Sequence, residues 1–203
     1  EEDLVRRYNL LQTFLKESKQ FGQQRQESEK NAVEIGLDNL SRNAGYEDSI
    51  RFSWAMEAKA TQQIMEKATL TLDDTTIKLV VDEQGKAELE VTKGDKTLKS
   101  IPDKYKKNKE VEALKDSKTY LTKQYSRTRL SLEQAMLSQT LFTAAELGKI
   151  LEHPVVKAML SKLVLFNPET QASGFWQDGK LLSAEGSLTP LKATDKLLIA
   201  HPS

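Results

Sequence analysis

The spacing of apolar residues changes near residue 69, and this change most constrains the fold. Before it, apolar residues recur every three or four positions, the spacing of an amphipathic helix. After it, apolar residues alternate with polar ones, the spacing of half-buried strands, at Leu70, Leu72, Ile77, Leu79, Val81, Ala87, Leu89 and Val91. Helices and strands thus occupy separate runs, without alternating βαβ units. The sequence predicts the α+β fold class.

Residues 1–67 are predicted to form a helical region. Its apolar stripes indicate helices over residues 3–22, 29–43 and 47–67. The polar stretch GQQRQESEKN between the first two could be an exposed helical continuation or a loop. Trp54 lies in the middle of the third stripe, and we expect it to anchor the packing of that helix.

Residues 68–203 are predicted to form an α+β region with three parts. Residues 68–100 read as an antiparallel β-meander with turns at DD, DEQG and KGDK and a short fourth strand beginning at Leu98. Residues 102–162 read as a long helix over about 108–139 followed by two short helices. A capping box at Thr143 and Glu146 opens the first short helix, and Pro154 lies in the first turn of the second. Residues 163–203 read as a second small sheet, with strands at KLVLF, SGFW, LLSAEGSL and KLLIA.

Composition excludes several classes of protein. The 203 residues are 38% hydrophobic, which is enough for a buried core and argues against a disordered chain. The 30 basic and 30 acidic residues cancel, so any binding to nucleic acid or anionic lipid must come from a local patch. The chain has no cysteine, no long apolar run and no basic leader, which favours a soluble cytoplasmic protein without membrane contact. It lacks an initiator Met and stops after a predicted strand, so we expect a fragment of a longer protein.

The two histidines, His153 and His201, are each followed by proline. They could meet as metal ligands if the second sheet packed beside the helix junction. However, proline restricts the preceding residue to extended geometry, and both histidines stand where an element begins or ends. We therefore interpret them as structural terminators and expect no metal site.

No catalytic constellation is apparent in the sequence. It contains no G-x-S-x-G, H-E-x-x-H, Walker or G-x-G-x-x-G pattern. The carboxylates of Glu57 or of Asp73 and Asp74 could perform acid–base chemistry, but acidic residues in turns and on helix surfaces are ordinary. We expect neither a cofactor nor an enzymatic activity.

Residues 101–130 carry a local excess of positive charge. Nine basic residues stand against four acidic ones, a surplus of five, and tyrosines are interleaved with them. Such a strip can follow a phosphate backbone, although a solvated helix face is the commoner outcome. The candidate nucleic-acid contacts are Lys104, Lys106, Lys107, Lys109, Lys115, Lys118, Lys123, Arg127 and Arg129.

From about residue 39 onward, the chain resembles a known family. The stretches NAGYEDSIRFSWAMEAKA, KSIPDKYKK, DGKLLSAEG and LLIAHPS, and the long segment from RTRLSLEQAM to KLVLF, carry the resemblance. They are similar to a bacterial domain of unknown function that accompanies the WGR (Trp-Gly-Arg) domain in large proteins like the molybdate metabolism regulator. The resemblance implies a long intracellular parent protein and supplies no catalytic residue. The WGR domain itself is not within these residues.

Two functional hypotheses follow. The first is a non-catalytic structural and interaction segment whose partners are other domains of the parent protein. The alternative is a nucleic-acid-linked regulator, or part of an enzyme, in which the basic strip at 104–129 contacts phosphates. The arrangement of those lysines and their acidic neighbours distinguishes the two.

Overall fold

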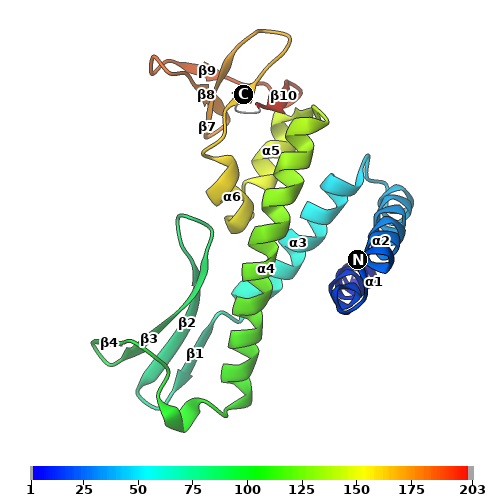
Figure 1. The fold of residues 1–203 in the computed structure, drawn as a ribbon. Coiled ribbons are helices and arrows are strands. Elements are labelled where there is room, and N and C mark those ends of the chain that lie inside the picture. Colours follow the sequence, from blue (N-terminus) through cyan, green and yellow to red (C-terminus); the bar gives the residue numbers. More distant parts are fainter. Residues whose placement is uncertain (1, 201–203) are drawn as a thin grey trace. The chain divides into compact units, whose positions relative to one another are not determined.

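The computed structural model describes residues 2–200 and divides the chain into two compact units, Glu1–Gln62 and Gln63–Ser203. The first unit is helical. The second contains helices and two antiparallel sheets of four and six strands (Figure 1). The predicted α+β fold class is confirmed.

The first unit begins with two helices joined by a tight connection. The predicted first helix is too long, because α1 (Glu2–Glu17) is followed by a single 3-10 turn, η1 (Ser18–Gln20), and Phe21 is extended. Gly22 then caps α2 (Gln23–Asn43), so the polar stretch is helical and begins the second helix, which starts six residues before the predicted residue 29. Its polar side chains support the helix one turn apart, since Arg25 Nε lies 2.7 Å from Glu29 Oε1.

An aromatic cluster forms the centre of the first unit. Phe52 of α3 (Ser49–Glu66) makes edge-to-face contacts with Tyr8 and Tyr46, with ring centroids 6.1 and 5.4 Å away. The Tyr8 hydroxyl donates a 2.6 Å hydrogen bond to Glu57 Oε1, which gives the buried carboxylate a polar partner. Trp54 is only 3% exposed, as its position on the stripe predicts.

The β-meander forms the first part of the second unit, with strand order β1-β2-β3-β4 and antiparallel pairing throughout. Its fourth strand is present but spans Lys96–Leu98, so it ends at the residue where it was predicted to begin. The apolar face of the sheet shares one core with Val111, Leu114 and Leu121 of the long helix α4 (Lys109–Leu137). The strands are β1 (Thr69–Leu72), β2 (Thr75–Val81), β3 (Ala87–Lys93) and β4 (Lys96–Leu98).

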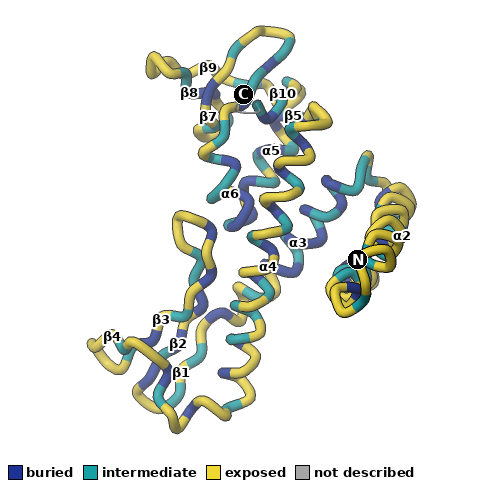
Figure 2. Tube along the Cα trace, viewed as in Figure 1, coloured by how far each residue is buried: buried dark blue, intermediate teal, exposed yellow. Residues whose placement is uncertain are grey.

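Helix α4 (Lys109–Leu137) follows a 3-10 turn, η2 (Asp103–Tyr105), and extends from the meander to the second sheet (Figure 1). Asn108 starts it by accepting hydrogen bonds from the first-turn amides. Buried positions recur along one side of the helix (Figure 2). Just after its exposed C-terminal end, the Ser138 and Thr140 hydroxyls form a hydrogen bond, 2.9 Å apart.

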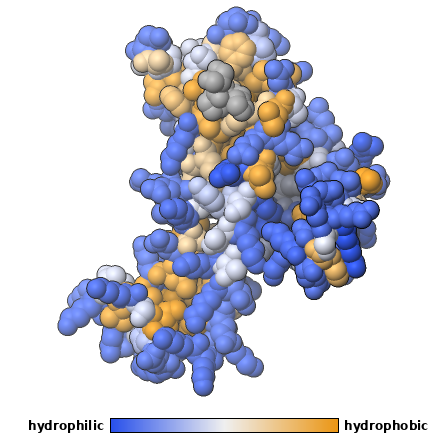
Figure 3. All heavy atoms as spheres, in the orientation of Figure 1, coloured by the Kyte–Doolittle hydropathy of each residue, from blue (hydrophilic) through white to orange (hydrophobic). Residues whose placement is uncertain are grey.

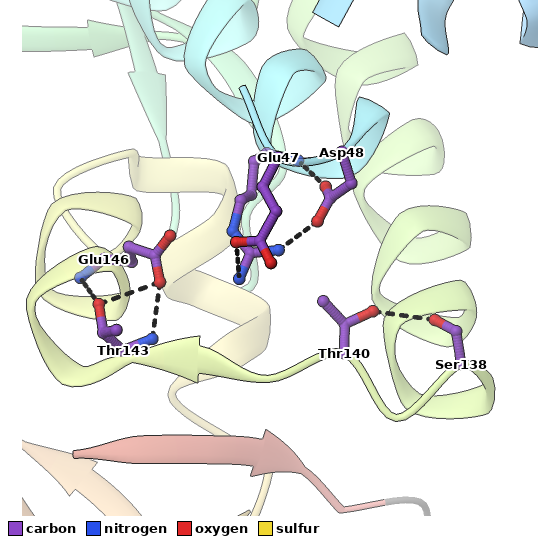
Figure 4. Close-up of polar contacts among 7 residues, drawn as sticks. Glu47, Asp48, Ser138, Thr140, Thr143 and Glu146 are labelled. Atoms are coloured by element: carbon purple, nitrogen blue, oxygen red, sulfur yellow. Dashed lines mark hydrogen bonds and ion pairs between the residues drawn. The ribbon is translucent and has the colours of Figure 1, made fainter. Parts of the chain in front are cut away.

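Two short helices and a second sheet complete the unit. The predicted capping box opens α5 (Ala144–Ile150), where the Thr143 amide donates to Glu146 Oε2 at 2.7 Å and the Glu146 amide donates to Thr143 Oγ1 at 3.2 Å (Figure 4). Pro154 occupies the first turn of α6 (Pro154–Leu160), also as predicted.

The second sheet has the strand order β5-β10-β6-β7-β8-β9. Its first strand, β5, was not predicted, because two residues are too few to show an alternating pattern. LLSAEGSL forms β8 and β9, joined by a turn over residues 183–187. The strands are β5 (Phe142–Thr143), β6 (Leu165–Phe166), β7 (Ser173–Gln177), β8 (Lys180–Leu182), β9 (Leu188–Pro190) and β10 (Lys196–Ile199).

Candidate functional site

The nine basic residues of the predicted strip divide between a loop and a helix. Lys104, Lys106 and Lys107 precede α4, and the other six lie on it. Because an α-helix rises 1.5 Å per residue, the helical part spans about 30 Å from Lys109 to Arg129. That length would cover several phosphates of a duplex if the charges shared one face.

The loop lysines are partly neutralised. Lys104 Nζ lies 3.0 Å from Asp73 Oδ2, and Lys106 Nζ lies 2.6 Å from Asp103 Oδ1. The Tyr105 hydroxyl donates a 2.6 Å hydrogen bond to the same oxygen of Asp73. The hydrogen bond from Tyr105 and then that from Lys104 lower the pKa of Asp73. Asp73 therefore keeps its negative charge at neutral pH, beside the start of the strip.

On α4 the basic residues do not share one side. Helix positions advance by about 100° per residue. Lys109 and Arg127 consequently share one side, whereas Lys118 and Arg129 lie about half a turn away from them. The strip wraps around most of the exposed part of the helix.

Acidic residues interrupt this exposed surface. Glu112, Asp116 and Glu133 alternate with the basic residues around the helix, and all three are exposed. Arg129 Nε lies 3.3 Å from Glu133 Oε1. The Arg127 guanidinium lies 5.4 Å from the centre of the Tyr120 ring. The helix presents a mixed-charge surface rather than a continuous basic face.

His153 lies at the junction that the sequence indicated. It is the N-cap of α6, and its Nδ1 accepts a 3.2 Å hydrogen bond from the Val155 amide. Since Nδ1 accepts, the neutral ring carries its proton on Nε2. That atom lies 2.7 Å from Nε2 of Gln124. A proton on His153 Nε2 needs an acceptor there, which the Gln124 side chain supplies when its amide is turned so that the oxygen takes the place of the nitrogen. Burial lowers the pKa of His153 to about 4, so the ring is neutral at pH 7.

Sequence reasoning missed two buried polar residues of α4, of which Gln124 contacts His153. Gln124 and Thr128 are fully buried one turn apart, and Thr128 Oγ1 has no hydrogen-bond partner among the described residues. The sequence did contain a sign of these residues: between Leu121 and Leu132, positions on the buried side of the helix are occupied by polar residues. His201, the second histidine, lies outside the described residues.

The carboxylates considered for acid–base chemistry have structural contacts. Glu57 accepts from Tyr8. Asp73 and Asp74 form the β1–β2 turn and pair with Lys104 and Lys93, respectively. Within residues 2–200, no cluster of three or more His, Asp or Glu side chains is arranged to hold a metal ion.

None of the helices in the described part of the chain combines the length and apolar character needed to cross a membrane.

Comparison with known protein families gives two matches. Residues 1–56 match the family described as "Family of unknown function (DUF5724)", and residues 95–203, more than half of the chain, match the one described as "Domain of unknown function (DUF4132)". Residues 57–94, which include most of the β-meander, lie between the matched ranges. No curated protein and no solved structure matches the chain. The expected domain of unknown function is confirmed, whereas neither description refers to a WGR domain or a molybdate regulator.

Proposed function

The chain belongs to the DUF4132 family of domains of unknown function, and we propose that it is a non-catalytic structural and interaction segment of a larger bacterial cytoplasmic protein. Its partners in this proposal are other domains of the parent protein. The resemblance to a domain that accompanies the WGR domain supports a multidomain parent.

The observation that carries this proposal is the exposure of large apolar side chains in both units. Leu10 of α1 is 68% exposed and Leu137 of α4 is 76% exposed. Burying one such side chain against a partner would contribute up to a few kcal/mol of free energy, which is not gained while the side chain stays in water. The other exposed large apolar side chains are Phe14, Ile35, Met65, Leu130, Leu141, Val164, Phe175 and Leu188.

Cross-linking of the parent protein tests the proposal. The chain has surface lysines throughout, so an amine-reactive cross-linker followed by mass spectrometry reports its neighbours. We expect cross-links from lysines of residues 1–203 to other domains, and we expect Phe14→Ser with Leu137→Ser to reduce a subset of them. Cross-links confined to residues 1–203 would contradict the proposal.

The alternative function is a nucleic-acid-linked regulator, or part of an enzyme, in which the basic strip at 104–129 contacts phosphates. It is favoured by the observation that Lys107, Lys109, Lys115, Lys118 and Lys123 make no ion pair within residues 2–200. It is disfavoured by the dispersal of these lysines around α4 and by the acidic residues among them.

A titration with duplex DNA separates the two functions. Binding through the strip would be tight, would weaken steeply as salt rises, and would lose part of that slope on charge reversal at Lys104, Lys107 and Lys118. We expect weak binding or none. Tight, salt-sensitive binding that responds to these reversals would establish the alternative.

A further inference from the structure

The two faces of the second sheet differ in how they are covered. Leu165, Leu181 and Leu197 point to the inner face and are at most 1% exposed. Trp176 lies on the same face, where its ring is 3.8 Å from the position a Cβ on Gly148 of α5 would take. The inner face is therefore the packed side of the sheet.

The outer face carries a row of apolar side chains. Strand register places Phe175 of β7 opposite Leu182 of β8, and Leu182 opposite Leu188 of β9. Phe175 is 40% exposed and Leu188 is 46% exposed. On the neighbouring strands Phe166 and Leu198 form a second pair on the same face, opposite Ser173 and thus two residues along β7 from Phe175. In the space-filling view, apolar residues lie among polar ones in the region of this sheet (Figure 3).

The charges on these strands are of one sign. Lys180 and Lys196 are the charged residues of β5–β10, and the register places both on the outer face. Both are exposed, and neither pairs with an acidic residue of the described chain. The outer face thus carries its apolar side chains together with Lys196 on β10 and Lys180 on β8, towards opposite ends of the sheet.

We propose that the outer face of this sheet, centred on Phe175, Leu182 and Leu188, binds an amphipathic helix of another domain that presents an apolar stripe flanked by carboxylates. A helix is the element that covers one face of an antiparallel sheet in α+β proteins. The apolar stripe would bury Phe175 and Leu188, and the carboxylates would pair with Lys180 and Lys196.

Edge pairing is a weaker alternative for this sheet. The edge strand β9 ends at Pro190, which has no amide hydrogen to donate to an added strand. The opposite edge strand, β5, has only two residues. Neither edge offers a long row of free backbone groups.

A lipid surface also fits the face less well than a helix does. Turns around the sheet carry Asp178, Glu185 and Asp195, whose charges oppose an extended anionic surface. A single helix, about 10 Å across with its side chains, presents a much narrower surface than a bilayer does. The arrangement of charges therefore favours a compact acidic partner.

The inference rests on the proposed interaction function, and a helix library tests it directly. Helical peptides with randomised apolar and flanking positions, displayed on phage, are selected against the intact protein and then titrated as synthetic peptides. We expect selected helices to carry acidic flanks. Phe175→Ser with Leu188→Ser should weaken their binding by at least about tenfold, as loss of an interface anchor does. Lys180→Gln and Lys196→Gln should each weaken it by about threefold.

Leu130→Ser with Leu137→Ser is the matched control, because it removes exposed leucines from α4 and should leave peptide binding unchanged. All these side chains are at least partly exposed, and thermal melts verify that the variants remain folded. Failure to select helices, or selection of helices insensitive to Phe175 and Leu188, would overturn the inference. Sedimentation with phosphatidylserine vesicles that depends on Phe175 and Lys180 would overturn it in favour of a lipid surface.

The cross-linking experiment separates this inference from the proposed function. If cross-links to other domains persist unchanged in the Phe175→Ser, Leu188→Ser variant, the chain is an interaction segment but this face is not its docking surface. If no such cross-links form in the wild type, the proposed function itself fails.

Discussion

At the scale of single residues, His153 couples the fold to pH. Its pKa falls from 6.5 to about 4 on burial, so the unfolded chain binds more protons than the folded chain between these values. The contribution of the neutral His153 ring to the free energy of unfolding is fully present above pH 6.5 and is lost as pH falls toward 4. The pKa difference corresponds to a loss on the order of 3 kcal/mol.

His153→Asn tests this coupling, because the asparagine side chain keeps an N-cap acceptor and does not titrate. We expect the wild type to be more stable at pH 7, and its advantage over the variant to shrink by on the order of 3 kcal/mol between pH 7 and pH 4. Denaturant unfolding at both pH values measures the difference. Parallel pH profiles for the two proteins would show that the buried ring does not contribute.

Trp54 carries a second residue-scale prediction. Its side chain is 3% exposed, so Trp54→Ala should cost on the order of 3–5 kcal/mol by loss of buried apolar surface and creation of a cavity. Trp54→Phe, which keeps part of the ring volume, should cost less. Chemical denaturation measures both, and a loss below about 1 kcal/mol for the alanine variant would contradict the expected packing role.

Residue roles were predictable where they depend on sequence neighbours. Pro154 indicated that His153 begins a helix, and Thr143 with Glu146 indicated the next cap, because both motifs act within three residues. The burial of Gln124 depends on His153, 29 positions later. Local spacing cannot reveal a polar residue that is buried for a distant partner.

At the scale of elements, the tip of the β2–β3 hairpin docks on two helices. Gly85 has φ of +81°, and an added Cβ would lie 3.1 Å from Cβ of Ala158 in α6 and 3.2 Å from the Tyr125 ring of α4. Lys162 Nζ also donates a 3.2 Å hydrogen bond to the Glu83 carbonyl of this turn. Gly85→Ala should therefore destabilise the protein by on the order of 3 kcal/mol, from backbone strain and overpacking together.

Gly186→Ala is the matched control for Gly85→Ala. Gly186 has φ of +82° and nothing within 4 Å of an added Cβ, so the substitution reports backbone strain alone, about 1–2 kcal/mol. Thermal or denaturant unfolding of both variants gives the difference. Equal losses would show that the hairpin tip tolerates the methyl group and is not tightly docked.

Elements were predictable where the apolar pattern is long. The meander and α4 carry several periods each, whereas β5 has two residues and takes its structure from pairing with β10. The end of α1 was missed because Leu15 and Phe21 continue the apolar stripe across the bend. There the extended backbone of Phe21 and the cap at Gly22 override helical spacing.

At the scale of the whole molecule, the excess of basic residues at 101–130 in the sequence does not produce a continuous basic surface in the structure. The surplus at 101–130 is a property of the sequence, but its arrangement depends on rotation around α4 and on Asp73, which is distant in sequence from most of the strip. The outer face of the second sheet shows the converse. Phe166, Phe175, Leu188 and Leu198 are scattered along the chain and become neighbouring only through strand register.

The division into two compact units makes a prediction that the two tryptophans can report separately. Trp54 lies in the first unit and Trp176 in the second. Because the first unit has the fewer buried apolar residues, it should unfold at the lower denaturant concentration.

Fluorescence of the Trp176→Phe variant, which keeps only Trp54, follows the first unit. Fluorescence of the Trp54→Phe variant, which keeps only Trp176, follows the second. We expect the first transition to have the lower midpoint and the shallower slope, since the slope scales with the surface exposed on unfolding. Circular dichroism of each variant, which reports both units at once, provides the control for altered stability. Coincident midpoints and slopes would show that the chain unfolds as one cooperative structure, with the two cores contributing to a single transition.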